Sequence, residues 1–193
     1  MTPDRAGQER SGHRPPGRNR VAERMKFIQG SGSSTFGPVG VYYVRVAPDA
    51  IVVRDVRRRR EIGDVPQAAV DAAGRVVAVG REAGEQPLLA AGSAAIRSPF
   101  ARSTLAGEDV DAAVAILKHL VRGLRRVTWL PVMIRGMIVH PDFAFADPLT
   151  TEERDAFLAM ARGAGARTVH VWEGRALTDD EVFEAFAPPA YRL

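Results

Sequence analysis

The chain has 193 residues, 46% of them hydrophobic, and contains no cysteine. This length suits one well-buried domain, and the lack of cysteine excludes a disulfide framework, a thiolate metal site and a thiol nucleophile. The formal net charge of +4 lies entirely in residues 1–26, which hold seven basic and three acidic side chains, so the remainder carries 20 of each sign and is neutral.

This uneven charge and composition divide the chain into four predicted parts. Residues 1–29 are too polar to bury a core, so we expect a disordered basic tail. Residues 30–40 (GSGSSTFGPVG) lack the spacing of a phosphate loop and are interpreted as a Gly/Ser linker. Residues 41–187 form the folded domain, and residues 188–193 form a short C-terminal tail. We expect no secretory signal and no membrane-spanning segment, and either Met1 or Met25 as the start.

The first elements predicted after the linker are two strands. Residues 41–46 (VYYVRV) and 51–53 (IVV) are β-branched and aromatic, and they flank a turn at Pro48, so they form a hairpin. A run of four arginines follows at the far end of this hairpin. We interpret it as a solvated turn, with a phosphate- or partner-binding patch as the alternative. The four residues are Arg57, Arg58, Arg59 and Arg60.

A third strand is predicted at residues 76–79 (VVAV), after a reversal at Gly74. The Ala-rich residues before this reversal, 66–70, fit either a strand or a loop. Residues 81–91 follow as a short helical segment that Pro87 interrupts.

Three helices are predicted in the second half of the chain. From residue 108 to 126 the apolar positions keep to one face, with acidic residues in the first turn and arginines in the last. Thr150 and Thr178 are each followed three residues later by Glu, the spacing of a capping box at a helix start. Strands are predicted at 137–139, where His140 and the following proline end the apolar run, and at 168–172.

The order is then three strands, a helix, a strand, a helix, a strand and a last helix. A strand-helix-strand unit in one sheet implies parallel strands and a right-handed crossover. We therefore predict an α/β fold of ribonuclease-H-like architecture, which is also one half of the actin fold. It should have a mixed five-stranded sheet with helices on both faces.

Three stretches resemble MreB, the bacterial actin homologue of the rod shape-determining family. Glu61–Ala83 is similar to its Asn-Glu-Pro-Ser strand followed by GKVVAVGEEA, and Ala95–Leu124 is similar to its Ile-Arg-Pro-Leu stretch and the next helix. Met137–Thr178 is similar to a strand ending in Val-Pro-Ser-Gly, a helix and the segment GAREVYLIEEPMAA, which reads GARTVHVWEGRALT here. The resemblance implies the N-terminal, actin-like half of that family, known as actin-like ATPase domain I.

This sequence differs from the family pattern at the residues that form the family's nucleotide site. The family's phosphate-binding turn is Asp-Leu-Gly-Thr, whereas the corresponding residues here are Arg45-Val46-Ala47-Pro48. A cation thus replaces the carboxylate that organises the metal, and Pro48 has no N–H to offer. The sequence stops at Leu193, where the resemblance places the second half with the adenosine pocket, so we expect no complete clamp for ATP.

Three residues are weak candidates for inherited nucleotide contacts. Thr151 stands where the family has a Glu that positions water, and Glu173 is what remains of a paired Glu-Glu-Pro. Glu153 matches a second family Glu, but it is also the expected capping-box partner of Thr150. We therefore expect no catalytic residue and no cofactor, with ATP and magnesium only under the alternative below.

His140 is the best remaining candidate for a binding residue, because it stands beside Asp142 at the carboxyl end of a strand, where ligands bind in open α/β sheets. The alternative is an ordinary loop histidine. No histidines have metal-ligand spacing, so no metal site is expected.

The functional hypothesis is a non-catalytic MreB-like structural or interaction protein of the cytoplasm, tied to cell shape or the bacterial actin cytoskeleton. Its expected partners are actin-like filament subunits or cell-shape proteins, and residues 1–26 are expected to contact anionic membrane. One alternative is a nucleotide-binding module completed by a second chain. Another is a nucleic-acid-associated protein acting through the basic tail, although no specific nucleic acid is expected.

Overall fold

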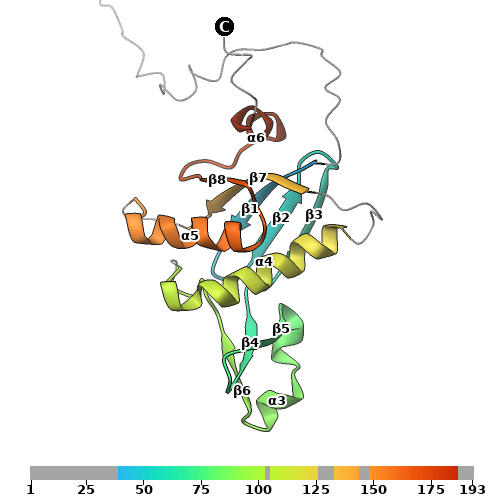
Figure 1. Cartoon of the computed structure of the whole chain (residues 1–193), viewed down its shortest axis with the longest axis vertical. Coiled ribbons are helices and arrows are strands. Elements are labelled where there is room, and N and C mark those ends of the chain that lie inside the picture. The colour runs from blue at the N-terminus through green and yellow to red at the C-terminus, as the bar shows by residue number, and fades with distance from the viewer. Residues whose placement is uncertain (1–38, 103–104, 126–132, 144–147, 187–193) are drawn as a thin grey trace, which may run out of the picture. The chain divides into compact units, whose positions relative to one another are not determined.

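A five-stranded mixed sheet organises the domain in the computed structural model, which describes residues 39–102, 105–125, 133–143 and 148–186 (Figure 1). The predicted tails and most of the predicted linker lie outside the described residues. The strand order is β3-β2-β1-β7-β8. The strands are β1 (Val39–Val46), β2 (Ile51–Asp55), β3 (Arg60–Asp64), β7 (Met133–Pro141) and β8 (Thr168–Val171).

The central strand β1 pairs antiparallel with β2 and parallel with β7, and β7 pairs parallel with β8. Val44 lies opposite Val53 on one side and Val139 on the other. These strands form because their β-branched and aromatic residues fit a pleated surface that is covered on both faces. The predicted hairpin, the mixed sheet and the parallel crossovers are confirmed.

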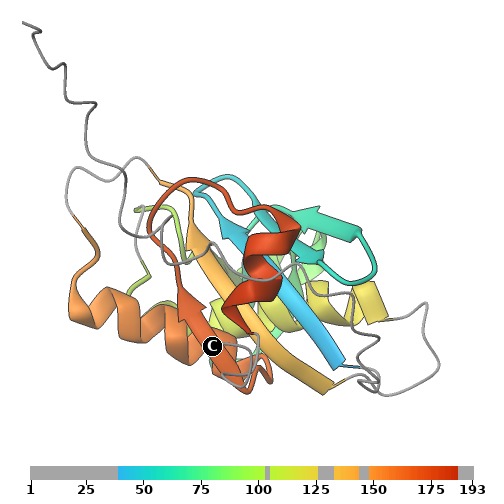
Figure 2. The same ribbon diagram turned by 90° about the horizontal axis from the view of Figure 1, so that it is seen from above.

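Helices cover both faces of this sheet, as predicted (Figures 1 and 2). On one face, Tyr42 and Val44 of β1 pack with α4 (Val110–Arg125) and α5 (Thr151–Gly163) in the larger hydrophobic core. A short 3₁₀ turn, η1 (Gly107–Asp109), leads into α4. On the other face, the alternate residue Tyr43 packs with Val182 of α6 (Asp179–Ala185). No helix in the described part of the chain is both long and apolar enough to cross a membrane.

Both predicted capping boxes are present. Thr150 accepts a hydrogen bond from the Glu153 N–H, and the Glu153 carboxylate accepts one from the Thr150 N–H, which satisfies two backbone donors at the start of α5. Thr178 and Glu181 repeat this arrangement at α6.

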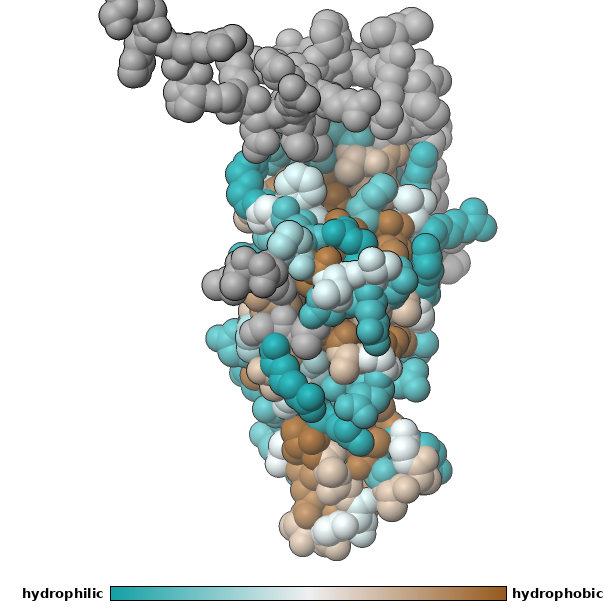
Figure 3. Space-filling view, turned by 90° about the vertical axis from the view of Figure 1, so that its left-hand side faces the viewer, coloured by the Kyte–Doolittle hydropathy of each residue, from teal (hydrophilic) through white to brown (hydrophobic). Residues whose placement is uncertain are grey.

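A second sheet of three strands, in the order β5-β4-β6, lies between β3 and α4 in the sequence. Gly74 has a φ of 78° in the reversal between β4 and β5, and the ambiguous Ala-rich segment is a strand. In Figure 3 hydrophobic residues gather over this sheet, at the bottom of the view. Its elements are β4 (Ala68–Asp71), β5 (Val76–Val79), β6 (Ala94–Arg97) and the short helices α2 (Arg81–Gly84) and α3 (Pro87–Ala90).

The third strand was predicted in the wrong sheet. Residues 76–79 belong to the smaller sheet, and β3 supplies the third strand of the main one. β3 is an edge strand whose only large apolar residue is Ile62, so its sequence carries little of the alternation that marks a half-buried strand. The run at residue 137 also extends further than predicted, because His140 and Pro141 are part of β7.

Candidate functional site

The strongest candidate site in the main sheet is the edge where β1, β7 and β8 end. Parallel strands bring their carboxyl ends together, and ligands in open α/β sheets bind at such an edge. Arg45 lies opposite His140 in the ladder between β1 and β7. The Asp142 N–H then donates to the Val46 carbonyl, which holds the chain after β7 against the end of β1.

His140 is a buried strand residue here, not the loop residue of the alternative interpretation, and only 3% of it is exposed. Its Nδ1 lies 2.6 Å from the Tyr43 hydroxyl oxygen. The same hydroxyl accepts a hydrogen bond of 3.1 Å from the Leu177 N–H. The Tyr43 hydroxyl therefore ties β7 to the loop that precedes α6.

Burial and these contacts favour the neutral form of His140. With the Leu177 N–H donating to the Tyr43 oxygen, the hydroxyl can donate its own proton to His140 Nδ1, an arrangement in which Nδ1 is the unprotonated ring nitrogen. Burial lowers the pKa of His140, while Asp142 and a backbone hydrogen bond with Gly174 oppose this effect in part. Burial also raises the pKa of Tyr43. Both groups are accordingly neutral near pH 7.

Arg54 closes the same network from β2. It donates a hydrogen bond of 3.0 Å to the Leu177 carbonyl, pairs with Asp179 at 3.1 Å and lies 5.1 Å from the centre of the Tyr43 ring. A guanidinium at this distance from an aromatic face is attracted to it. The start of α6 is thus fixed to the sheet through polar contacts on both sides of Leu177.

The turn between β1 and β2 is the segment that corresponds to the family's phosphate loop. The Ala47 N–H donates to the Ala50 carbonyl at 2.8 Å, and Pro48 has no N–H. Phosphate loops instead direct several free N–H groups at their ligand. By the resemblance, Arg45 stands where the family has its metal-organising carboxylate. The residues present therefore do not fit a magnesium nucleotide bound in the way the resemblance implies.

Two of the three inherited candidates, Glu153 and Glu173, make contacts that stabilise the fold. Glu153 completes the capping box of α5, and the neighbouring Thr151 is exposed. Glu173 accepts a hydrogen bond of 2.8 Å from the Leu149 N–H and forms an ion pair with Arg154. The two carboxylates stabilise the start of α5. Within the described ranges, no group of three or more His, Asp or Glu side chains is placed to hold a metal ion.

Three of the four arginines, Arg57, Arg58 and Arg59, lie in the turn between β2 and β3, as the solvated-turn interpretation predicts, and Arg60 begins β3. Arg58 pairs with the buried Asp55 at 2.8 Å and so anchors the turn. Arg57, Arg59 and Arg60 are exposed, and Arg59 has a φ of 51°. This turn is at the opposite end of β1 from Arg45, because Tyr42 near the start of β1 pairs with Asp55. The arginine turn and His140 therefore belong to separate surfaces.

Sequence reasoning missed Tyr43, Arg54 and Leu177 as partners of His140. The alternation of β1 and β2 could have placed Tyr43 and Arg54 on one face, since they pair directly across the hairpin. Nothing local connects them to His140, which is 97 residues further along the chain than Tyr43.

Comparisons with known proteins establish the fold. No protein-family model matches the sequence, and a search of curated proteins found no match. Among solved structures, MreB5 of Spiroplasma citri bound to ADP has a TM-score of 0.53 and 16% identity, over 70% of this chain and 38% of that one. The AMPPNP-bound form of MreB5 has a TM-score of 0.52 and 16% identity, over 71% of this chain and 39% of that one. A MamK double helical filament has a TM-score of 0.50 and 17% identity, over 68% of this chain and 40% of that one.

The predicted actin-like, ribonuclease-H-like fold is confirmed by these neighbours, and identities of 16–17% show the fold alone. The chain spans only 38–40% of the length of these structures, which agrees with the predicted resemblance to one half of an actin-like protein.

Proposed function

We propose, starting from this actin-like fold, that the chain is a non-catalytic structural or interaction protein of the bacterial actin cytoskeleton, acting in the cytoplasm and associated with cell shape. Its partners are subunits of actin-like filaments or cell-shape proteins. It needs no cofactor for this role. One of its structural neighbours is a filament of MamK, and the proposal extends that kind of assembly to a partner of this chain.

The observation that carries the proposal is the turn between β1 and β2. A nucleotide phosphate placed there would meet the Arg45 guanidinium, but it would find the Ala47 N–H already donated to Ala50 and no N–H on Pro48. Magnesium would find a cation where it needs a carboxylate oxygen. Binding of phosphate with its metal is therefore unfavourable at this turn.

The first test is isothermal titration of the full chain with ATP and magnesium, together with a phosphate-release assay. We expect neither heat of binding nor hydrolysis. Stoichiometric binding with hydrolysis would overturn the non-catalytic assignment. If the unmodified chain does not bind ATP, the variant Arg45→Asp tests whether Arg45 blocks the site, and we expect this variant to bind the nucleotide measurably. An unchanged affinity would show that Arg45 is not the obstacle.

The filament partnership is tested by co-sedimentation of the chain with polymerised MreB. We expect the chain in the pellet only when filaments are present, in amounts that saturate with filament concentration. Absence from the pellet at saturating filament would contradict the partnership. Contact of residues 1–26 with anionic membrane is tested in parallel with vesicles, and equal binding by the full chain and a variant lacking these residues would refute that contact.

The second candidate is a nucleotide-binding module completed by another chain. It is favoured by the position of Thr151, Glu153 and Glu173 in the segments that follow β7 and β8, at the carboxyl edge of a parallel sheet, where ligands bind in open α/β folds. Sedimentation velocity with and without ATP separates it from the main proposal, because only this candidate requires ATP-dependent association.

A further inference from the structure

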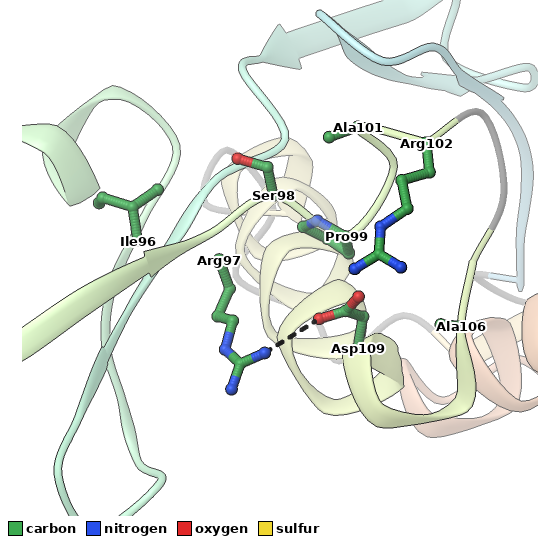
Figure 4. Close-up of a pocket in the computed structure, with 8 residues that line it drawn as sticks. All are labelled: Ile96, Arg97, Ser98, Pro99, Ala101, Arg102, Ala106 and Asp109. Atoms are coloured by element: carbon green, nitrogen blue, oxygen red, sulfur yellow. Dashed lines mark ion pairs between the residues drawn. The ribbon is translucent and has the colours of Figure 1, made fainter.

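A cavity of about 200 Å³ lies where β6 ends and the chain turns toward η1 and α4 (Figure 4). It is far in the sequence from His140 and the arginine turn, and no role considered so far involves it. Its polar lining consists of Arg97, Ser98, Arg102 and Asp109.

One carboxylate, that of Asp109, lies between two guanidinium groups in this cavity. In Figure 4 Arg97 and Arg102 approach Asp109 from opposite sides. The Arg97–Asp109 pair is long, at 3.8 Å, which exceeds a direct hydrogen bond. Arg102 is exposed and has no ion pair or hydrogen bond within the described part of the chain. The cavity therefore carries one net positive charge and several guanidinium N–H donors that protein groups do not use.

The remaining walls define the size and polarity of the ligand. Pro99 and two alanine side chains provide apolar surface beside the arginines. A volume of about 200 Å³ is below the usual range for drug-sized ligands, and it suits a single oxyanion with a short carbon chain. Polymers and whole nucleotides are larger than this space.

We propose that this cavity binds a small phosphate monoester between the guanidinium groups of Arg97 and Arg102. A phosphate monoester carries roughly −1.5 to −2 charges at pH 7 and has three strong acceptor oxygens. Its three oxygens can therefore accept hydrogen bonds from both guanidinium groups at once, whereas the carboxylate of Asp109 has only two oxygens to offer them. The apolar walls take the carbon chain. This inference does not depend on the proposed cytoskeletal function.

The experiment is titration of the full chain with glycerol 3-phosphate, followed by calorimetry and by amide chemical shifts in NMR. We expect saturable binding, with shifts confined to residues 96–109, and weaker binding of inorganic phosphate, which lacks the carbon chain. Glycerol should produce no shifts. Lack of saturation at about 10 mM ligand, or equal shifts with glycerol, would overturn the proposal.

Matched variants separate the site from general attraction of anions. Arg97→Gln and Arg102→Gln should each weaken binding roughly tenfold, and Arg102→Lys should weaken it less because it keeps the charge but loses the planar fork. The control is Arg81→Gln, which removes an exposed charge outside the cavity whose distance to Asp64 is 3.7 Å. If the control weakens binding as much as the cavity variants, the assignment is wrong.

Two further comparisons identify the source of the phosphate and keep this result separate from the cytoskeletal proposal. Vesicles containing phosphatidic acid present the same monoester as a lipid headgroup. Binding to them that depends on Arg102 would identify a lipid source, and binding of the soluble ester alone would identify a metabolite. ATP-induced shifts at residues 45–48 would bear on the nucleotide question, whereas shifts at 96–109 belong to this cavity.

Discussion

Two adjacent tyrosines of β1 provide a controlled measurement of the His140 network. Tyr42 and Tyr43 are 0% and 2% exposed, and they point to opposite faces of the sheet. The Tyr43 hydroxyl joins His140 to the Leu177 N–H, whereas the Tyr42 hydroxyl is buried without a hydrogen-bond partner within the described ranges. Replacing each by Phe removes one oxygen from a similar environment, but only one of the two oxygens makes hydrogen bonds.

The expected magnitude follows from the groups left behind. Tyr43→Phe leaves the Leu177 N–H and His140 Nδ1 unpaired, and Leu177 and His140 are 6% and 3% exposed. A buried polar group that loses its partner costs about 1–3 kcal/mol, so the loss of partners for two groups should lower the free energy of unfolding by about 2–6 kcal/mol. Tyr42→Phe removes a buried hydroxyl that makes no hydrogen bond to offset its desolvation, so the free energy of unfolding should stay the same or rise slightly.

Urea denaturation followed by circular dichroism measures both variants against the unmodified chain. The urea concentration at the unfolding midpoint should fall for Tyr43→Phe, with no change in the slope of unfolding free energy against urea concentration. For Tyr42→Phe the midpoint should stay the same or rise. The Phe ring retains the contact with Arg54, so the loss reports the hydroxyl alone. Equal midpoints for the two variants would refute the inference that the Tyr43 hydroxyl holds His140 and Leu177 together.

Three further outcomes are expected. Because burial lowers the pKa of His140 in the folded state, the unfolded state binds more protons below about pH 6.5, so stability should fall as pH decreases through that range. His140→Asn should flatten this dependence in urea midpoints measured across the range. Gly80→Ala should destabilise by about 2 kcal/mol or more, because Gly80 has a φ of 67° and the added Cβ would collide with the Asp64 carboxylate. Gly84→Ala, where the Cβ meets open space, should not destabilise, and an equal loss in thermal melts would contradict the argument. Thr178→Ala should cost about 1 kcal/mol through loss of the α6 cap, and an unchanged melting temperature would contradict it.

Local signals predicted the local features of this fold. A capping box involves only a Thr and the Glu three residues after it, so Thr150 and Thr178 could be placed at helix starts from the sequence. The β4–β5 reversal at Gly74 and the long amphipathic helix α4 were predictable for the same reason, because each depends on residues within one or two turns.

Features that depend on distant residues could not be predicted in this way. β3 has one large apolar side chain, and its place at the edge of the main sheet is set by pairing with β2. His140 could be nominated from its place in the sequence, but its burial and its hydrogen bond to Tyr43 depend on residues that a local pattern does not connect to it. The cavity at Arg97 and Arg102 likewise appears only when the end of β6 meets the start of α4.

The parallel pairing of β1 with β7 also constrains the order in which the domain can fold. β1 and β2 are joined by a short turn and can pair early, as can the three strands of the smaller sheet, whereas Tyr43 must wait for His140, 97 residues later. Closing so long a loop costs entropy before any contact repays it, which slows folding. During synthesis, once the chain has emerged from the ribosome as far as α4, the first hairpin and the smaller sheet can already form. The inner edge of β1 stays unpaired until β7 emerges, and in that interval it is the part of the nascent domain most exposed to wrong pairing.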